Sequence, residues 1–487
     1  MIKFSKNIKY HYSIITIIIP LISITAAALG VPVFNNVLTR IIAISAIILT
    51  FITWMLFDRW LLEKCSPDQS RRIIQTRLFS LCFLFLPFAM NASRDTWCNL
   101  WLDLLSYSGL VCFFSVICAS RIEPLIQHIK NPSEKSMFLI FLLISVVYFI
   151  ILGTQAASSF SAYSSEWVDN SWEFASIWQT ARGSIFRMIN DYSQETSMLS
   201  YHWPLIYILI APFTVLWSDP RMVLWIYTFC FAFSGFTVYL LAKERTRSKQ
   251  MGFFIGILFL FYLPVHLANL FDMHADPLAM PFLFLCFYFA EKNKWKPYFV
   301  SMILALMCKE YAGLAFLGYG IWLSFRNLKI GIITALTGLS WFIFVINFGV
   351  PFFNEGKPPL MINSCYGELG DSKGLFGMLL FSILNFTQVL ERIFTQNNIV
   401  AMTSLFLPLL FIPLRKPWII LCGILISLKN LLSLTGMNLL NHRETLFSPF
   451  VVYALIIYFS EINNKSLKRF RIIAVLFAVI TTFFLQG

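Results

Sequence analysis

The sequence predicts an all-helical integral membrane protein with about fifteen transmembrane helices. Of its 487 residues 58% are apolar and only 13% are charged, against roughly 25% charged in soluble domains. The mean hydropathy is +0.73 over the whole chain, so the apolar residues are not confined to one anchor. Apolar runs of the roughly 17–25 residues that cross a bilayer recur from Ile14 to Phe484.

Each predicted span follows an apolar run that is interrupted at both ends by charged or turn-forming residues. In chain order the spans are 13–30, 38–57, 78–92, 99–119, 137–154, 222–242, 251–269, 277–290, 297–308, 311–325, 330–349, 398–414, 418–434, 445–460 and 471–486.

Basic residues are concentrated in the connections that these spans place on one side. With the N-terminus inside, the inner connections hold 26 of the 37 Lys and Arg but only 8 of the 24 acids. Membrane proteins collect Lys and Arg on their cytoplasmic loops. The asymmetry therefore predicts a cell (inner, cytoplasmic) membrane protein with a cytoplasmic N-terminus, and it explains the net charge of +13 without a nucleic-acid partner.

Two further apolar stretches are expected to lie along the outer face as interfacial or re-entrant helices. If Pro204–Trp217 crossed the bilayer, the basic loop Lys243–Lys249 would lie outside, against the charge asymmetry. Leu375–Ile393 starts after a glycine and ends in polar residues. Neither stretch is therefore counted as a span.

The chain divides into a front module and a core. Residues 1–130 form two helical hairpins with few polar groups, so we expect a separate four-span N-terminal module. Residues 131–487 form the transmembrane core, with extracytoplasmic loops at 155–221, 350–397 and 435–444. Because the inner connections are short, any chemistry is expected on the outer side, at the membrane surface.

Polar side chains from five separate segments gather on this predicted outer face, and polar groups near membrane depth usually have a function. Carboxylates with His and basic groups suit group transfer from a phosphate-linked donor. One carboxylate takes the proton of the attacking hydroxyl, and cations or a bound metal hold the charge on the leaving phosphate. The residues are Asp169, Glu173, His202, Asp272, His274, Asp276, Lys309, Glu310, Lys429, His442 and Arg443.

Structural explanations stand beside the functional one for these residues. Asp169 has the position of a loop acid or helix cap, and Asp276 precedes Pro277 as a cap would. Lys309 and Glu310 are neighbours that could pair only with each other. Lys429 could extend toward the interface as long basic side chains do.

Four motifs follow one another along the core, and their order and spacing carry a resemblance. The region from about Met137 to the C-terminus resembles a family of predicted membrane proteins of unknown function that is grouped with the GT-C-type membrane glycosyltransferases, which use lipid-linked sugars. The motifs are V-D-N-S-W-E-F-A-S-I-W-Q-T-A-R-G (168–183); His202 with Ala211-Pro212; F-D-M-H-A-D-P-L-A-M-P (271–281) followed by L-M-C-K-E-Y-A-G-L (306–314); and the weaker Tyr366-Gly367, Leu369-Gly370 and Asn430-Leu431-Leu432-Ser433.

This chain departs from the family pattern at three places. Phe174 stands where the family has a second Asp, and Tyr311 stands where it has an Asp after Lys-Glu. Pro204 displaces a Ser-Pro that follows the motif His. If the missing acids bind a metal in relatives, this chain binds one weakly or not at all.

The resemblance implies a GT-C-like bundle and an inverting glycosyltransferase. A polyprenyl-phosphate-linked sugar would reach the site from the outer leaflet of the membrane lipid, and the acceptor is unknown. In GT-C enzymes the acid just after the first core span is typically the catalytic carboxylate, which is Asp169 here. The expected catalytic residues are Asp169, Glu173, Lys309 and Glu310; the substrate- and phosphate-binding residues are His202, His274, Lys429, His442 and Arg443; and Asp276 and His274 are the candidate ligands of a divalent cation, Mg²⁺ or Mn²⁺.

Two other functions are compatible with the same residues. A transporter or flippase of a lipid-linked or anionic solute would use them as a binding site, although transporters usually show internal repeats and polar groups near the bilayer midplane. A non-catalytic membrane scaffold would keep the fold without the chemistry, as the Phe174 and Tyr311 departures suggest.

Overall fold

The computed structural model describes residues 132–162, 167–190, 194–359, 365–366, 374–433 and 442–461, which belong to one compact unit from Lys130 to Ile462. The predicted front module at 1–130 and the predicted last span at 471–486 lie outside the described residues. The four-span module therefore stays a prediction.

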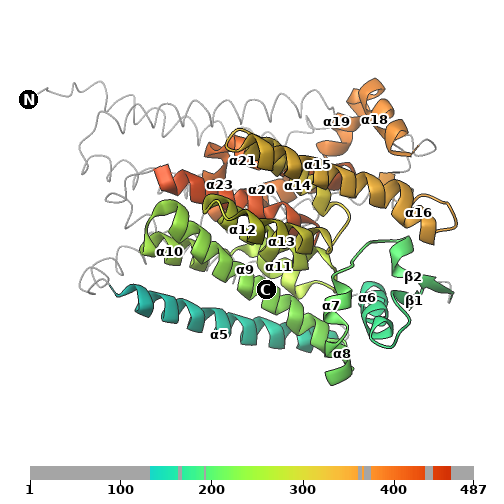
Figure 1. The fold of residues 1–487 in the computed structure, drawn as a ribbon, viewed down its shortest axis with the longest axis horizontal. Coiled ribbons are helices and arrows are strands. Elements are labelled where there is room, and N and C mark those ends of the chain that lie inside the picture. Colours follow the sequence, from blue (N-terminus) through green and yellow to red (C-terminus); the bar gives the residue numbers. More distant parts are fainter. Residues whose placement is uncertain are drawn as a thin grey trace, which may run out of the picture. The chain divides into compact units, whose positions relative to one another are not determined.

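Almost all described elements are helices (Figure 1). The first half of the unit contains α5 (Glu134–Ser161), α6 (Trp167–Thr180), β1 (Arg187–Ile189), β2 (Glu195–Ser197), the 3₁₀ turn η2 (Met198–Ser200), α7 (Tyr207–Ile210), α8 (Phe213–Leu216), α9 (Arg221–Thr246), α10 (Lys249–Leu260), α11 (Leu263–Leu270), α12 (Asp276–Glu291) and α13 (Trp295–Leu306).

The second half begins with two helices that form an antiparallel pair. Its elements are α14 (Ala312–Ser324), α15 (Leu328–Phe344), the π-helical turn η3 (Val345–Gly349), α16 (Val350–Phe353), α18 (Gly374–Leu384), α19 (Phe386–Ile393), α20 (Gln396–Phe406), the 3₁₀ turns η5 (Leu407–Leu409) and η6 (Ile412–Arg415), α21 (Pro417–Cys422), α22 (Ile424–Leu432), η7 (His442–Leu446) and α23 (Ser448–Glu461).

Within the described residues helices form where the sequence predicts spans, but many are shorter than one bilayer crossing. Among the described residues α5, α9 and the run Leu328–Phe353 are long and apolar enough to cross alone, and α10 with α11, bent by 44°, makes a fourth crossing if the pair is one broken span. The 13 residues of α14 extend about 20 Å, less than the ~30 Å hydrocarbon core. The predicted count of fifteen spans is not confirmed.

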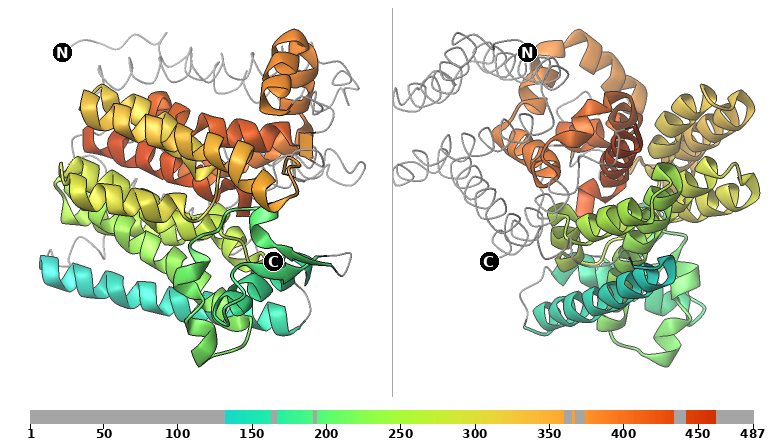
Figure 2. Two further views of the ribbon diagram at one scale, coloured as in Figure 1. Left: turned by 45° about the vertical axis from the view of Figure 1, so that its right-hand side comes forward. Right: turned by 90° about the vertical axis from the view of Figure 1, so that its left-hand side faces the viewer.

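From α9 to α15 the chain runs back and forth along the bundle, with α10 and the bent continuation α11 counted as one passage (Figures 1 and 2). Capped turns separate them: α9 ends at Arg247 in the left-handed region (φ 52°), and Ser248 then caps α10 by accepting a hydrogen bond from Met251 N. Asn327 caps α15 in the same way through Ile330 N. These turns bring the connections after α9, α12 and α14 to one end of the bundle.

Small residues allow α14 and α15 to approach closely. A Cβ on Gly313 would lie 2.3 Å from the Gly338 carbonyl oxygen, and one on Gly338 would lie 2.5 Å from the Gly313 carbonyl oxygen. Helices buried in lipid associate through such small-residue contacts, because apolar burial alone gives no preference for protein over lipid tails. The contact fixes the position of the turn at 309–311 that precedes α14.

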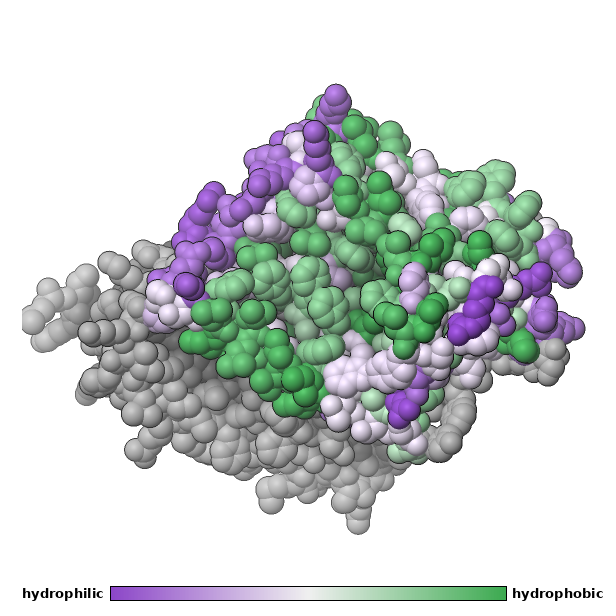
Figure 3. All heavy atoms as spheres, turned by 60° about the horizontal axis from the view of Figure 1, so that its bottom comes forward, coloured by the Kyte–Doolittle hydropathy of each residue, from purple (hydrophilic) through white to green (hydrophobic). Residues whose placement is uncertain are grey.

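The exposed surface is apolar where a membrane would surround it. Along α5 the side chains of Leu139, Leu143 and Ile151 are 51%, 63% and 58% exposed. Figure 3 shows one face of the molecule, on which a broad apolar area lies between hydrophilic margins. This distribution agrees with the predicted membrane location.

The first long outer loop requires a correction to the all-helical prediction. β1 and β2 pair antiparallel, with Arg187 opposite Ser197 and Ile189 opposite Glu195. Strands of three residues carry too little alternation to be recognised in a sequence. The apolar stretch expected as one interfacial helix is two short helices, α7 and α8, and the second such stretch is likewise divided into α18 and α19.

The basic connections predicted on the inner face meet around one buried carboxylate. Glu291, whose side chain is 5% exposed, accepts hydrogen bonds from Arg245 (3.1 Å), from Arg326 (2.9 and 3.2 Å) and from the Tyr453 hydroxyl. These residues come from α9, α12, the α14–α15 turn and α23. The network therefore joins four elements at this end, which we name the basic end.

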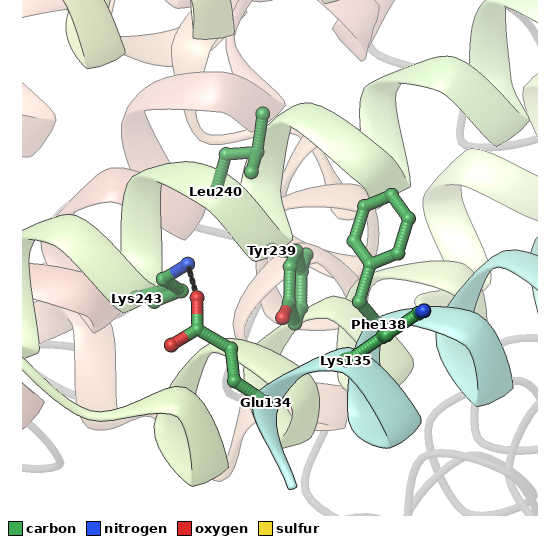
Figure 4. A pocket seen from close by; sticks show the side chains of 6 residues that line it. All are labelled: Glu134, Lys135, Phe138, Tyr239, Leu240 and Lys243. Atoms are coloured by element: carbon green, nitrogen blue, oxygen red, sulfur yellow. Dashed lines mark hydrogen bonds and ion pairs between the residues drawn. The ribbon is translucent and has the colours of Figure 1, made fainter.

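A shallow, open depression also lies at the basic end, between α5 and α9 (Figure 4). Glu134 and Lys243 form an ion pair across it, while Phe138 and Tyr239 form its apolar wall. It contains one exposed ion pair and no set of convergent acid, base and cationic groups. We therefore look for chemistry at the opposite end.

Glu291→Ala is expected to destabilise the bundle strongly, because it leaves the two arginines without their buried counter-charge. Breaking a buried ion pair typically costs about 3–5 kcal/mol, which should appear as a large fall in the melting temperature of the purified protein. The matched control is Glu134→Ala, which removes an exposed ion pair at the same end and should change the melting temperature little. Equal effects of the two variants would contradict this role for Glu291.

Candidate active site

Polar side chains from six segments meet at the end of the bundle opposite to the basic end. Helix α12 starts here at Asp276 and reaches Glu291 after 16 residues, about 24 Å along its axis. The segments are the start of α6, the chain at 201–203, the α11–α12 connection, the turn before α14, α22 and η7. Figures 1 and 2 show α6 and α7 beside this end of the bundle.

The centre of the site is a buried ion pair. Lys309 Nζ lies 3.2 Å from Asp276 Oδ2, and the two side chains are 1% and 0% exposed. The Tyr311 hydroxyl donates to Asp276 Oδ1. Burial by itself would lower the pKa of Lys309, but the Asp276 and Glu310 charges outweigh it and raise the pKa, so the ammonium stays charged.

Asp169 lies on the first turn of α6 and pairs with an imidazole. Its Oδ2 is 3.3 Å from His274 Nε2, and its side chain is 37% exposed while that of His274 is 9% exposed. The next residue, Asn170, donates to Asp272 Oδ1 (3.2 Å) and accepts from Met273 N (2.8 Å), which attaches α6 to the α11–α12 connection. Burial opposes ionisation of Asp169, but the His274 hydrogen bond and nearby cations give it a lowered pKa.

Glu310 points away from its neighbour Lys309 and holds the chain at 202–203. Its Oε1 lies 2.8 Å from His202 Nδ1, and its Oε2 accepts from Trp203 N at 3.2 Å. Burial alone would raise the pKa of Glu310, but the His202 charge and hydrogen bond, together with Lys309, lower it to about 2. Glu310 is therefore a permanent anion that orients an imidazole.

Glu173 differs from the other carboxylates in having a raised pKa. It is 4% exposed and accepts a hydrogen bond from the Tyr207 hydroxyl, which lies 3.4 Å from the Tyr227 hydroxyl. Burial raises its pKa more than the Lys309 and His274 charges lower it. Glu173 is thus suited to holding a proton, whereas Asp169 and Glu310 are suited to remaining ionised.

A second group of cations lies beyond the Tyr311 ring. Lys429 Nζ lies 3.7 Å from the centre of that ring, a cation–π distance. The Tyr366 hydroxyl donates to the Lys429 carbonyl (2.9 Å), and Arg443 Nη1 donates to Ser433 Oγ (3.3 Å). Lys309 interacts electrostatically both with Asp169 and with Lys429, so its charge reaches both groups.

Next to these cations, the side chains of Asn430 and Glu444 are joined by a hydrogen bond. Asn430 Nδ2 donates to Glu444 Oε1 at 2.6 Å and to the Arg443 carbonyl at 2.9 Å. Asn430 is 0% exposed and Glu444 is 2% exposed. Burial raises the pKa of Glu444 to about 7, against the lowering effects of the Asn430 hydrogen bond and the Lys429 charge.

The predicted cation ligands Asp276 and His274 do not form a metal site. No group of three or more His, Cys, Asp or Glu side chains in the described ranges is placed to hold a metal ion. The two Asp276 oxygens instead face the Lys309 ammonium and the Tyr311 hydroxyl, and His274 faces Asp169. The residues present do not fit an Mg²⁺ or Mn²⁺ site, and a divalent cofactor stays an untested prediction.

The structure brings nearly all the predicted site residues together, but it changes several pairings. Lys309 and Glu310 do not pair with each other, because the tight turn sends their side chains to Asp276 and His202 respectively. Asp276 is not a helix cap: Ala275 has the N-cap position. Lys429 lies against Tyr311. The side chain of His442 lies outside the described residues.

Sequence reasoning missed four contributors to the site. Asn170, Tyr311 and Asn430 stand inside the motifs, but none was assigned a role in the site, and Tyr311 was treated only as a departure. Glu444 directly follows the predicted His442-Arg443 pair, and Asn430 directly follows the predicted Lys429. A polar residue adjacent to a predicted site residue was the available signal in each case.

Comparisons with known proteins identify a family and one similar structure. The family model described as "Predicted membrane protein (DUF2079)" matches residues 174–486. No curated protein matches the chain. A solved structure of ArnT from Cupriavidus metallidurans bound to undecaprenyl phosphate is similar at 12% identity and a TM-score of 0.41, over 67% of this chain and 61% of that one. The chain thus spans about three fifths of the length of that structure.

Glu310→Gln is expected to lower the melting temperature at pH 6, and the loss should shrink as the pH falls. An acid whose pKa is lowered by folding stabilises the protein above its unfolded pKa, about 4.5, and this contribution disappears as the pH falls through about 2. Melting curves of wild type and variant between pH 6 and pH 2.5 should therefore converge. Glu195→Gln, at an exposed pair with Arg187, is the control. A difference that is constant across this range would contradict a charge-based role.

Proposed function

This chain belongs to the DUF2079 family of predicted membrane proteins, and we propose that it transfers a sugar from a polyprenyl-phosphate donor to an acceptor hydroxyl at the extracytoplasmic face of the cell membrane. The proposal takes the bundle to be GT-C-like, as the motif resemblance implies. One observation carries it. A partly exposed carboxylate, Asp169, lies beside an imidazole and within electrostatic reach of the buried ammonium of Lys309.

Asp169 is the proposed general base. It is the most exposed of the carboxylates that meet at this site, so an acceptor hydroxyl can approach it. Its lowered pKa keeps it ionised and able to accept the hydroxyl proton. His274, at 3.3 Å, orients the carboxylate and provides a next position for the proton.

The cations provide the proposed phosphate site. They are Lys309, paired with Asp276, and Lys429 and Arg443, of which Lys429 lies against the Tyr311 ring. Preorganised positive charge in a site that excludes water stabilises negative charge that develops in the transition state. Glu310 contributes by fixing the orientation of the His202 imidazole.

The proposed reaction is a single displacement at the anomeric carbon. The acceptor oxygen forms a bond to that carbon while its proton passes to Asp169, and the bond from the carbon to the phosphate oxygen breaks. The electron pair stays on the phosphate, which leaves as polyprenyl phosphate next to Lys309. One displacement inverts the configuration at the anomeric carbon.

The charge distribution supports the proposed orientation. In the described residues Arg245 and Arg326 meet Glu291 at the end away from the site, as the basic residues of cytoplasmic loops do. The site then faces the extracytoplasmic side. Polyprenyl-phosphate sugars that act as donors in the outer leaflet would reach it from the surrounding lipid.

Asp169→Asn is expected to reduce sugar transfer by roughly 10²- to 10⁴-fold, the usual contribution of a general base, while donor binding is kept. Wild type and variant in nanodiscs would receive radiolabelled polyprenyl-phosphate sugars with candidate acceptors, and bound and transferred label would be followed. Asp219→Asn is the matched control, because Asp219 is an acid of the same outer loop that pairs only with Arg221 in the contacts seen at that turn.

Equal turnover by wild type and Asp169→Asn would contradict the assignment of the base. Donor binding without turnover in either protein would favour a carrier over a transferase. Absence of donor binding would favour a scaffold.

Turnover is expected to survive removal of divalent cations, because lysine and arginine hold the phosphate and Asp276 is already engaged by Lys309 and Tyr311. The transfer assay would be run after EDTA treatment, with and without added Mg²⁺ or Mn²⁺. Rates within about twofold of each other are the expected result. Loss of transfer in EDTA that added Mg²⁺ restores would show that a metal takes part, against this arrangement of the cations.

A further inference from the structure

Two buried oxygen atoms beside the proposed phosphate site lack hydrogen-bond donors. They are Asn430 Oδ1 and Glu444 Oε2, and neither has a hydrogen-bond partner within the part of the chain that the structure describes. The amide orientation of Asn430 is fixed, because its nitrogen donates to two acceptors, the Arg443 carbonyl and Glu444 Oε1. Buried acceptors nearly always receive a hydrogen bond, so two neighbouring acceptors without a donor need an explanation.

The charges next to these two oxygens limit which class of ligand could donate hydrogen bonds to them. Lys429 directly precedes Asn430 on α22, and Arg443 directly precedes Glu444 on η7. The phosphodiester of a polyprenyl-phosphate sugar has no hydrogen to donate, so it suits the two cations but neither Asn430 Oδ1 nor an ionised Glu444. The missing partner must carry O–H or N–H groups and lie next to an anion.

We propose that Asn430 and Glu444 form the subsite that accepts hydrogen bonds from the hydroxyl groups of the donor sugar, while Lys429 and Arg443 hold the phosphate to which that sugar is attached. The inference rests on the proposed function and specifies its substrate class. The donor is a neutral sugar with free hydroxyls. A uronic acid is disfavoured above about pH 7, where Glu444 is ionised and would repel its carboxylate.

Glu444 determines specificity in this arrangement. A site built to hydrogen-bond hydroxyls rejects analogues that lack them, because its buried polar atoms are then left unpaired. Bare polyprenyl phosphate carries the anion but no sugar, so it should bind through the cations alone. Comparing sugar-bearing with sugar-free lipid therefore isolates the contribution of Asn430 and Glu444.

The test is equilibrium binding of three lipids to the full-length protein in nanodiscs, without acceptor. The lipids are polyprenyl phosphate, its neutral hexose derivative and its glucuronic acid derivative. The variant is Glu444→Gln, which keeps the shape and the hydrogen bond from Asn430 but replaces the orphaned acceptor by a donor. At about pH 8, where wild-type Glu444 is ionised, the variant should bind the hexose lipid roughly tenfold more weakly, bind the glucuronic acid lipid more tightly, and bind bare polyprenyl phosphate as wild type does.

Glu461→Gln is the matched control, because Glu461 is an exposed acid at the far end of α23 that pairs with Lys416. Equal loss of all three lipids by Glu444→Gln, or no change in any of them, would overturn the proposal. If the variant does not fold, wild-type binding of donors that lack single hydroxyls gives the answer: unchanged affinity across the series would also overturn it. This binding test contains no acceptor and does not depend on turnover. A failure of the separate sugar-transfer assay would therefore contradict the proposed function but leave the binding result unchanged.

Discussion

The ion pair between Lys309 and Asp276 is the contact on which the rest of the polar end depends. Its two side chains are 1% and 0% exposed among apolar helices, where each isolated charge would cost several kcal/mol. The Asp276 and Glu310 charges keep the ammonium charged, and the Tyr311 hydroxyl donates a hydrogen bond to Asp276. The turn that places Lys309 also sends Glu310 to His202, and the Lys309 charge acts both on Asp169 and on Lys429.

The two ends of the bundle could be predicted because charge and hydropathy constrain them directly. The basic connections at 243–250, 291–296 and 326–329 had to lie on one side, and they meet around Glu291. The same alternation placed Asp169 and Lys309 at the other end. Helix lengths were less predictable, because an apolar run does not reveal where Pro264 or the α14 turn divides it. The two three-residue strands gave no periodic signal.

The pairings within the site could not be predicted, because they depend on how the chain turns between helices. Lys309 and Glu310 are neighbours in sequence, yet one turn separates their side chains and gives each a partner from a distant segment. Tyr311 replaces an expected acid, but its hydroxyl and ring contact Asp276 and Lys429. The Tyr311 departure suggested that a metal ligand had been lost. In the structure Tyr311 instead contacts Lys429 and the partner of Lys309, Asp276.

The most direct measurement combines Asp276→Asn with Lys309→Met and follows both melting temperature and binding of polyprenyl phosphate. Each single change leaves one buried charge unpaired, so each should lower the melting temperature strongly, whereas the double variant should recover much of the loss. The account predicts that the folded double variant binds polyprenyl phosphate at least tenfold more weakly than wild type, because the central cation is gone. A folded double variant with wild-type affinity would contradict the claim that this buried pair holds the phosphate site.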